Sequence, residues 1–160
     1  MKRCYLVSKG FLKFLDEQEG REVKRPFSLT WERIHSLGSA RAASVLAAKR
    51  GIDVELAYAA GVLHDFGRIV TRRQEDHALN GYEPVQEFLK ALKIFKAQEI
   101  REIALAVKSH SSKALLGTPL EEIAKDCDVL DSFLLGIAMR TEKHVQRLHA
   151  LQKELGFSGN

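Results

Sequence analysis

The chain has 160 residues, 45% of them hydrophobic, and a formal net charge of +4. This length and composition suit one globular domain with a single core over residues 1–160 and argue against two independent domains. The basic residues are scattered and form neither an arginine-rich arm nor a basic stripe with interleaved aromatic residues. The positive charge therefore fits a small anionic ligand and supports nucleic-acid binding only weakly.

Targeting signals and disulfides are not expected. No run approaches the roughly 18 apolar residues of a membrane span. Ser8, Lys9 and Lys13 interrupt the N-terminal apolar stretch before it could serve as the hydrophobic part of a signal peptide. We therefore expect a cytoplasmic protein that has no membrane partner. Cys4 and Cys127 stand far apart and outside any CxxC pattern, which favours two reduced structural thiols.

The first expected helix lies near the N-terminus and contains Phe11, Phe14 and Leu15. These three residues suit an interface between chains as well as they suit the core. The sequence therefore leaves the oligomeric state open.

The next two helices are marked at both ends. One is predicted over residues 31–50, with Thr30 as its N-cap and Gly51 as its stop. Its positions at helical spacing are Ile34, Leu37, Ala40, Arg41, Ser44, Val45 and Ala48. Asp53 can cap the following helix, which is expected to end at Gly67. The residues that share a face of that helix are Leu56, Ala57, Ala60, Leu63 and His64.

Three more helices are expected in the second half of the chain from their apolar spacing. Two run from about residue 83 to 92, with Pro84 tolerated in the first turn, and from about residue 97 to 110. The last one covers residues 137–155, ends at Gly156 and has a single apolar stripe.

The most clearly marked helix start lies in the segment TPLEEIAKDCDVLDSFLLG. Thr118 serves as N-cap, Pro119 occupies the first helical position and Glu121 closes a capping box. No stretch shows the alternating pattern of a strand, and the chain has no internal repeat or low-complexity tract. The predicted fold class is therefore an all-α helical bundle.

Four histidines and two aspartates on different predicted helices, or at their ends, form a candidate site. They are His35, His64, Asp65, His77, His110 and Asp128. Imidazole nitrogens and carboxylate oxygens together suit Fe, Mn, Co or Zn, and Mg where oxygen predominates. Adjacent helix residues point about 100° apart, so His64 and Asp65 cannot chelate one ion as an i, i+4 pair would. They can still face one cavity if the bundle converges there.

The order and flanks of these residues resemble a known family. His35, His64–Asp65 and Asp128 follow the H…HD…D signature of the HD-domain superfamily, which consists of metal-dependent phosphohydrolases with an α-helical fold. GVLHDFGR is similar to the common LLHDIGK of that family, HALNG to HAxxG, and KDCDVLD to kDADxLD. The resemblance covers about residues 30–133, so the expected fold is an HD-domain helical bundle flanked by an N-terminal and a C-terminal helix.

The resemblance implies a metal centre with one or two divalent ions per chain. It assigns a first ion to His35, His64, Asp65 and Asp128. His77 and His110 match the additional histidines of two-metal members, in which the aspartate of the HD pair bridges the ions.

The sequence departs from the family pattern at three positions. Arg68 stands where lysine is usual and keeps a positive charge, while Cys127 and Val129 replace residues that are often alanine and arginine. These changes bear on substrate choice more than on metal binding.

Two residues are candidates for direct catalytic roles. Clustered metal ions lower the pKa of a bound water and offset charge on phosphoryl oxygens during in-line attack. Asp65 could orient or deprotonate that water. Arg68 is a candidate phosphate clamp because guanidinium presents a planar fork of donors. Lys108 would add a second phosphate contact only if its helix end faces the cavity.

Other polar and aromatic residues are predicted to lie outside the metal centre. Asp131 is one turn beyond Asp128 and is expected either behind a ligand or on the helix surface. Trp31 and Phe27 are interpreted as packing anchors and not as platforms for base stacking. His144 and His149 are five residues apart, do not share a helix face and are expected to face solvent.

The predicted function is hydrolysis by metal-activated water of a phosphomonoester or phosphoanhydride bond in a small, nucleotide-like substrate. The HHExxDGxGYP motif of cyclic di-GMP phosphodiesterases is absent, which favours a stand-alone HD hydrolase. Two alternatives stay open: a regulatory HD module that senses a nucleotide without turnover, and an HD-fold oxygenase with two iron ions. Metal identity and redox behaviour would separate the oxygenase from a hydrolase.

Overall fold

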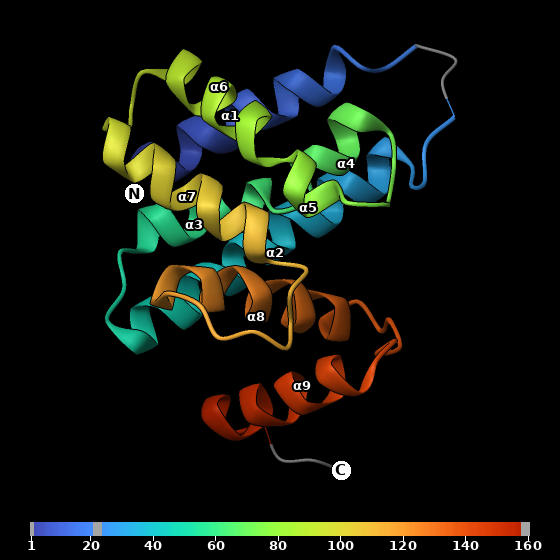
Figure 1. The fold of residues 1–160 in the computed structure, drawn as a ribbon, viewed down its shortest axis with the longest axis vertical. Coiled ribbons are helices and arrows are strands. Elements are labelled where there is room, and N and C mark those ends of the chain that lie inside the picture. The colour runs from blue at the N-terminus through green and yellow to red at the C-terminus, as the bar shows by residue number, and fades with distance from the viewer. Residues whose placement is uncertain (1, 21–23, 158–160) are drawn as a thin grey trace.

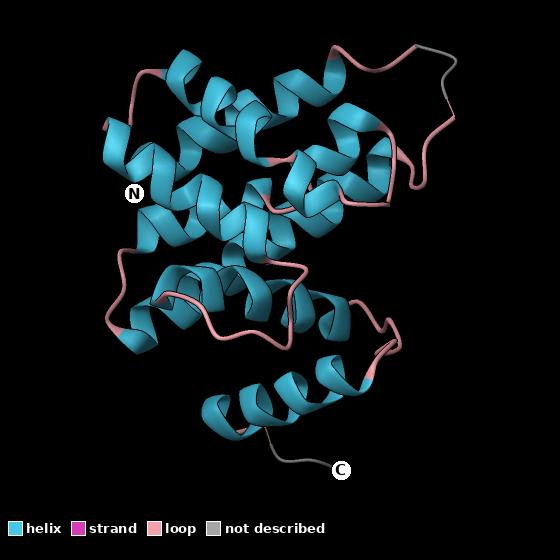
Figure 2. Cartoon of the chain, in the orientation of Figure 1, coloured by secondary structure: helices cyan, strands magenta, loops and turns pink. Residues whose placement is uncertain are grey.

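The computed structural model describes residues 2–20 and 24–157, and within these ranges it contains helices and loops but no strand (Figure 2). The helices are α1 (Lys2–Asp16), α2 (Leu29–Arg50), α3 (Val54–Leu63), α4 (Phe66–Thr71), α5 (His77–Asn80), α6 (Tyr82–Leu92), α7 (Ala97–Ser109), α8 (Pro119–Leu134) and α9 (Glu142–Leu155). The predicted all-α class is confirmed. Within the described ranges, no helix combines the length and the apolar character that crossing a membrane requires.

The helix ends follow local capping chemistry. Asp53 accepts hydrogen bonds from the first turn of α3, Thr118 and Glu121 form the expected capping box, and Gly51 ends α2 in the left-handed region at φ 69°. The predicted N-cap of α2 is wrong: Ser28, not Thr30, accepts a hydrogen bond from the Trp31 N–H at 3.1 Å. Ser28 has the extended backbone that points its hydroxyl at the first turn, whereas Thr30 is already helical.

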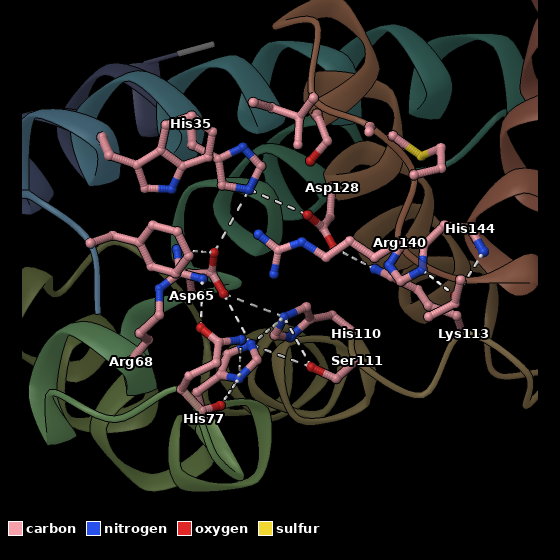
Figure 3. Close-up of a pocket in the computed structure, with 18 residues that line it drawn as sticks. His35, Asp65, Arg68, His77, His110, Ser111, Lys113, Asp128, Arg140 and His144 are labelled. Carbon is pink, nitrogen blue, oxygen red and sulfur yellow. Dashed lines mark hydrogen bonds and ion pairs between the residues drawn. The ribbon is translucent and has the colours of Figure 1, made fainter. Parts of the chain in front are cut away.

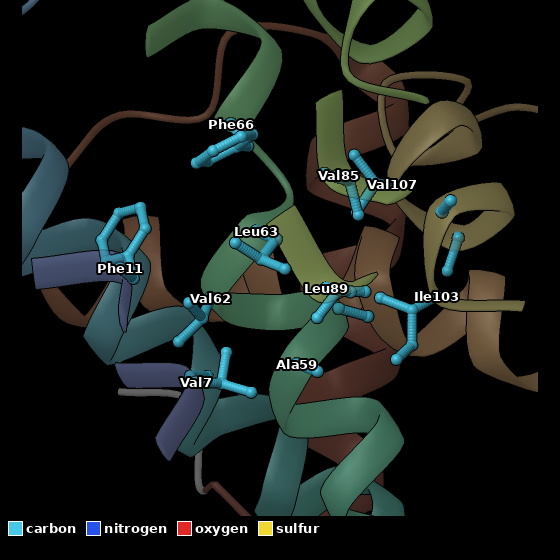
Figure 4. Packing of buried hydrophobic residues seen from close by; sticks show 14 of the residues in the cluster. Val7, Phe11, Ala59, Val62, Leu63, Phe66, Val85, Leu89, Ile103 and Val107 are labelled. Atoms are coloured by element: carbon cyan, nitrogen blue, oxygen red, sulfur yellow. The ribbon is translucent and has the colours of Figure 1, made fainter. Parts of the chain in front are cut away.

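Helix α3 is the centre of the bundle, between α1, α2, α7 and α8 (Figure 1). Ala57 and every residue from Ala59 to Leu63 are buried, so this helix is apolar on every side. Val7, Phe11 and Leu15 of α1 pack against it in the core (Figure 4). Phe11 and Leu15 therefore belong to the core of the chain.

Helix α2 buries a different face from the one that its apolar residues suggest. Ile34 and Val45 are 52% and 56% exposed, while small and polar residues face inward. The buried set is Glu32, His35, Ser36, Ser39, Ala40, Ala42, Ala43, Leu46 and Ala47. The small residues on this face let α3 approach closely: a Cβ on Gly61 would lie 2.8 Å from the Ala40 Cα. This close packing places the polar residues of α2 beside the end of α3.

The predicted helix between Asp53 and Gly67 is broken in the structure. Helix α3 ends at Leu63, a turn at His64 and Asp65 follows, and α4 begins at Phe66. Gly67 is therefore not a stop but lies within α4. A Cβ at this position would overlap the His77 carbonyl, so glycine is required for α4 to pack on α5. The sequence patterns did not predict the short helix α5.

The C-terminal helix α9 packs on α8 and begins at Glu142, five residues later than predicted. Leu148 and Leu151 attach its buried side to the core. An ion pair of 2.7 Å between Arg50 Nη2 and a Glu154 oxygen ties α9 to α2.

We expect the Arg50–Glu154 pair to make the free energy of unfolding vary with pH in the acidic range. Hydrogen bonding from Arg50 lowers the pKa of Glu154 from its usual value. A lowered carboxyl pKa stabilises the fold above the unfolded-state pKa of about 4.3, and this contribution is lost as pH falls through the folded-state value. Glu154→Gln should therefore be less stable than wild type in urea unfolding at pH 7, and the difference should shrink towards pH 3. A difference that is constant from pH 7 to pH 3 would contradict this.

Candidate metal centre

The six candidate ligands lie together, and five of them line one cavity of about 310 Å³ (Figure 3). The sixth, His64, is fully buried behind the cavity wall, with its Nε2 3.0 Å from the Asp65 Oδ2. Four helices or their ends and one turn supply them: His35 from α2, His64 and Asp65 from the turn between α3 and α4, His77 from the start of α5, His110 from the end of α7, and Asp128 from α8. The break after Leu63 lets the two adjacent residues of the HD pair point into the same space.

The first group of donors is formed by His35, His64, Asp65 and Asp128. The His64 Nε2 lies 3.1 Å from the His35 Nε2 and 3.0 Å from the Asp65 Oδ2. The Asp128 Oδ1 lies 3.3 Å from the His35 Nε2. Ligands about 2.1 Å from an ion and at right angles to each other are about 3 Å apart, so this spacing suits one divalent cation.

The second group uses the other oxygen of Asp65. The Asp65 Oδ1 lies 3.1 Å from the His77 Nε2 and 3.6 Å from the His110 Nε2, and these two nitrogens are 3.1 Å apart. The hydroxyl of Ser111 lies 3.4 Å from both nitrogens. Asp65 thus directs one carboxylate oxygen to each histidine pair, as a ligand that bridges two ions would.

Each of the four histidines is held by its Nδ1 atom. The Nδ1–H groups of His64, His77 and His110 donate to backbone carbonyls at 2.7–2.8 Å, and that of His35 donates to the Asp131 Oδ2 at 2.7 Å. This fixes the tautomer and leaves every Nε2 directed at the centre. Asp131 therefore lies behind a candidate ligand, which was one of the two positions expected for it.

The Nε2 atoms of His35 and His64 face each other at 3.1 Å, and so do those of His77 and His110. Their lone pairs repel each other unless a positive charge lies between them. Burial by itself would lower the pKa of His35, but hydrogen bonds with Asp128 and Asp131 raise it to about 10. Burial lowers the pKa of His110 to about 4, which keeps its Nε2 free to bind a cation. Protons meet this requirement in the chain alone, and divalent cations would replace them when bound. The donors are nitrogen and oxygen atoms, which fits Fe, Mn, Co, Zn or Mg.

Both carboxylates are held in the charged form. Burial would raise the pKa of Asp65, but its neighbours His64 and Arg68 hold it well below its usual range. The Lys113 ammonium has the same effect on the pKa of Asp128, from which it is separated by 2.5 Å. Charged carboxylates are the form that binds cations.

Arg68 lines the cavity, but its donors are largely occupied. Its Nε and Nη2 each donate to one carboxylate oxygen of Glu32 at 2.9 Å, and its Nη2 lies 2.5 Å from the Asp65 Oδ2. The guanidinium also stacks on the Phe27 ring at 4.4 Å. This arrangement positions Asp65 and leaves little of the guanidinium for a phosphate, so the predicted clamp role stays a prediction.

The structure adds residues that the sequence patterns did not predict. Glu32 is buried beside Arg68, and Lys113 is buried beside Asp128. Glu32 precedes His35 by three residues, a spacing that could have indicated a shared helix face. Lys113 lies in a loop with no periodicity, and no signal marked it. Lys108 does not line the cavity and lies over the Tyr82 ring at 5.3 Å instead.

The expectation for His144 is wrong, because its side chain is half-buried and lines the cavity. The first turn of α9 lies at the cavity wall, which sequence spacing could not indicate. His149 is exposed, as expected. Trp31 stacks on the His35 ring at 5.2 Å and Phe27 packs near Trp31, so both are packing residues that also form part of the cavity wall.

Removing the His77 side chain should disrupt the second group of ligands and leave the first group intact. We expect His77→Ala to lower the bound metal from two ions per chain to one, because the first group does not use this side chain. His149→Ala removes an exposed imidazole and should leave the count at two. Elemental analysis of the purified variants measures this, and an unchanged count in His77→Ala would exclude it as a ligand.

Known proteins resemble this chain in sequence and in fold. The model of the family described as HD domain matches residues 33–133, which contain all six candidate ligands. The chain is 30% identical to ribonuclease Y of Chlorobium phaeovibrioides over 128 residues and 31% identical to that of Lawsonia intracellularis over 129 residues. Each alignment covers 78% of this chain, which spans 23% of the length of each relative.

A solved structure shares the fold. It is a predicted HD superfamily hydrolase from an uncultured Thermotogales bacterium, and it matches with a TM-score of 0.56 and 20% identity over 97% of this chain and 88% of that one. Because the family model covers most of the chain and includes its clustered histidines and aspartates, the protein belongs to the HD domain family.

Proposed function

We propose that the protein is a metal-dependent phosphohydrolase that cleaves a phosphomonoester or phosphoanhydride bond of a small, nucleotide-like substrate. The observation that carries this proposal is Asp65, whose two oxygens lie 3.0 Å from the His64 Nε2 and 3.1 Å from the His77 Nε2. A carboxylate shared between two such groups suits a pair of divalent cations. When bound, these cations would make hydroxide available from water near neutral pH and offset charge on phosphoryl oxygens.

The residues around the centre have complementary tasks in this proposal. Asp65 and Asp128 would hold the ions, and their carboxylates would orient a water near them. Arg68 restrains the Asp65 carboxylate, and Lys113 restrains that of Asp128. Because both carboxylates are already restrained, the site is arranged before substrate enters and needs little reorganisation.

The size of the cavity favours a small substrate. Its volume of about 310 Å³ lies near the lower end of the range for ligand pockets. Half-buried Phe27 and Trp31 line one side and offer apolar contact for a flat group such as a nucleobase.

A second candidate function is hydrolysis of a phosphodiester bond in RNA. It is favoured by the identity of 30–31% with ribonuclease Y proteins over 128–129 residues. The same ions could serve either reaction, so the two candidates differ in what the cavity walls accept.

The proposal is tested by removing metal with a chelator, restoring Mn²⁺, Mg²⁺, Fe²⁺, Co²⁺ or Zn²⁺ separately, and separating the hydrolysis products by chromatography. The substrates are nucleoside monophosphates, nucleoside triphosphates, dinucleoside polyphosphates and a short RNA. Metal-dependent hydrolysis of a nucleotide that is absent from Asp65→Asn supports the proposal. Binding of a nucleotide without turnover would favour a sensing module, and oxygen consumption with Fe²⁺ would favour an oxygenase. Cleavage of RNA alone would favour the second candidate.

A further inference from the structure

One wall of the cavity lies outside the part of the chain that matches the HD domain. The match ends at residue 133, whereas Ile137, Met139, Arg140 and His144 of the α8–α9 connection and the first turn of α9 line the cavity. The candidate metal ligands all lie within residues 33–133, whereas this wall is formed by residues that follow them in the chain. It is therefore a place where this chain can differ in substrate recognition from other proteins with the same centre.

The wall is held in place at both ends. The Ile137 N–H donates to the Ser132 carbonyl at 2.9 Å after a left-handed turn at Gly136, where φ is 74°. Thr141 caps α9 by accepting a hydrogen bond from the His144 N–H at 3.3 Å. Arg140 thus projects from a short connection between two anchored helix ends.

Arg140 differs from Arg68 and Lys113, the other cations that line the cavity, because it has no counter-ion within residues 2–20 and 24–157. Arg68 is paired with Glu32 and Asp65, and Lys113 is paired with Asp128. Among the residues that the structure describes, Arg140 forms no hydrogen bond and no ion pair. Its side chain nevertheless points into the cavity on the side of the metal centre (Figure 3).

The charge of the centre determines which ligand this guanidinium can accept. With divalent cations bound, Asp65 and Asp128 are neutralised and the cavity floor becomes positive. A free guanidinium facing a positive floor calls for an anion that contacts both. The beginning of α9 lies at the same wall, and the positive end of a helix dipole favours an anion there as well.

We propose that Arg140 is the substrate-binding residue that contacts the non-bridging oxygens of the phosphate held at the metal centre. The guanidinium is exposed enough to accept the ligand and presents two parallel donors to a phosphate. This inference rests on the proposed phosphohydrolase function and assigns the contact to Arg140, from outside the family match, in preference to the already paired Arg68.

The test measures binding of inorganic phosphate to Mn²⁺-loaded protein by calorimetry, together with metal content. Arg140→Ala is expected to weaken phosphate binding by about 10- to 100-fold, the usual effect of losing hydrogen bonds to a charged group, and to leave the metal content unchanged. Arg140→Lys keeps the charge without the planar fork and should recover part of the affinity. Because Arg140 forms no hydrogen bond or ion pair with the described part of the chain, both variants should retain the circular dichroism and melting temperature of wild type.

Lys143→Ala is the matched control, because it removes a positive charge from the same end of α9 at an exposed position that does not line the cavity. Its phosphate affinity should stay within about twofold of wild type, since exposed charges at a distance are screened. An equal loss in both variants would mean a general charge effect and would overturn the inference.

The remaining outcomes separate this inference from the proposed function. Unchanged phosphate affinity in Arg140→Ala, with metal-dependent hydrolysis intact, would overturn the role of Arg140 alone. Loss of metal from Arg140→Ala would also overturn it, because Arg140 would then support metal binding and not contact the phosphate directly. If Mn²⁺-loaded wild type neither binds phosphate nor hydrolyses any substrate of the panel, the proposed function fails and the inference fails with it.

Discussion

Asp65→Ala is expected to lose both metal ions and to reduce phosphate release by at least about 1,000-fold. Among the residues described, 2–20 and 24–157, this side chain provides the only carboxylate that contacts both histidine pairs, through its Oδ1 and Oδ2 atoms. Two bound cations supply several kcal/mol of transition-state stabilisation, and each 1.36 kcal/mol corresponds to a factor of ten in rate. Elemental analysis and a phosphate-release assay on the same preparation measure both effects.

Asp126→Ala is the appropriate control for Asp65→Ala. Asp126 is also a buried aspartate, but it faces away from the cavity and pairs with Arg50 and Arg147. Its removal should lower stability and leave metal content unchanged. If Asp65→Ala keeps two ions, or if Asp126→Ala loses them to the same degree, the bridging role of Asp65 is wrong.

Arg68→Ala is expected to destabilise the fold by about 3–5 kcal/mol. The Glu32–Arg68 pair is buried, and both Glu32 oxygens accept hydrogen bonds from the guanidinium at 2.9 Å. Removing one partner of such a pair leaves an uncompensated buried charge. The Asp65 carboxylate also loses its 2.5 Å contact, so some loss of metal affinity should accompany the loss of stability.

A double-mutant cycle separates this role of Arg68 from phosphate binding. Glu32→Ala combined with Arg68→Ala should cost less free energy of unfolding than the sum of the single variants, because neither charge is then left alone. Urea unfolding measures the cycle. A different result would support the phosphate-clamp role expected from the sequence. In that case the single effects would be additive, and Arg68→Ala would have a stability near that of wild type but weaker phosphate binding.

Local sequence signals identified much of the fold. Thr118, Pro119 and Glu121 marked the start of α8 correctly because a capping box acts within one turn and needs no distant partner. Gly51 marked the end of α2 for the same reason. The N-cap of α2 was misplaced because Ser28 and Thr30 carry the same chemistry, and only the backbone conformation distinguishes them.

The buried face of α2 could not be predicted from its apolar residues. Ile34 and Val45 are the larger hydrophobic side chains, yet they face solvent because Gly61 and Ala40 let α3 approach the opposite face. Close packing of small residues depends on two helices that fit each other, and no periodicity within one of them shows it.

The identity of the six candidate ligands was determined by the sequence itself, because residue types, their order and their flanks are properties of the chain. Only the tertiary structure decided how they are arranged. It shows the helix break that brings the His64 Nε2 to the Asp65 carboxylate, the division of Asp65 between two histidine pairs, and the counter-ions that occupy Arg68. It also placed Arg140 at the cavity, from a segment with no motif. These features depend on distances between residues far apart in the chain, which local patterns do not encode.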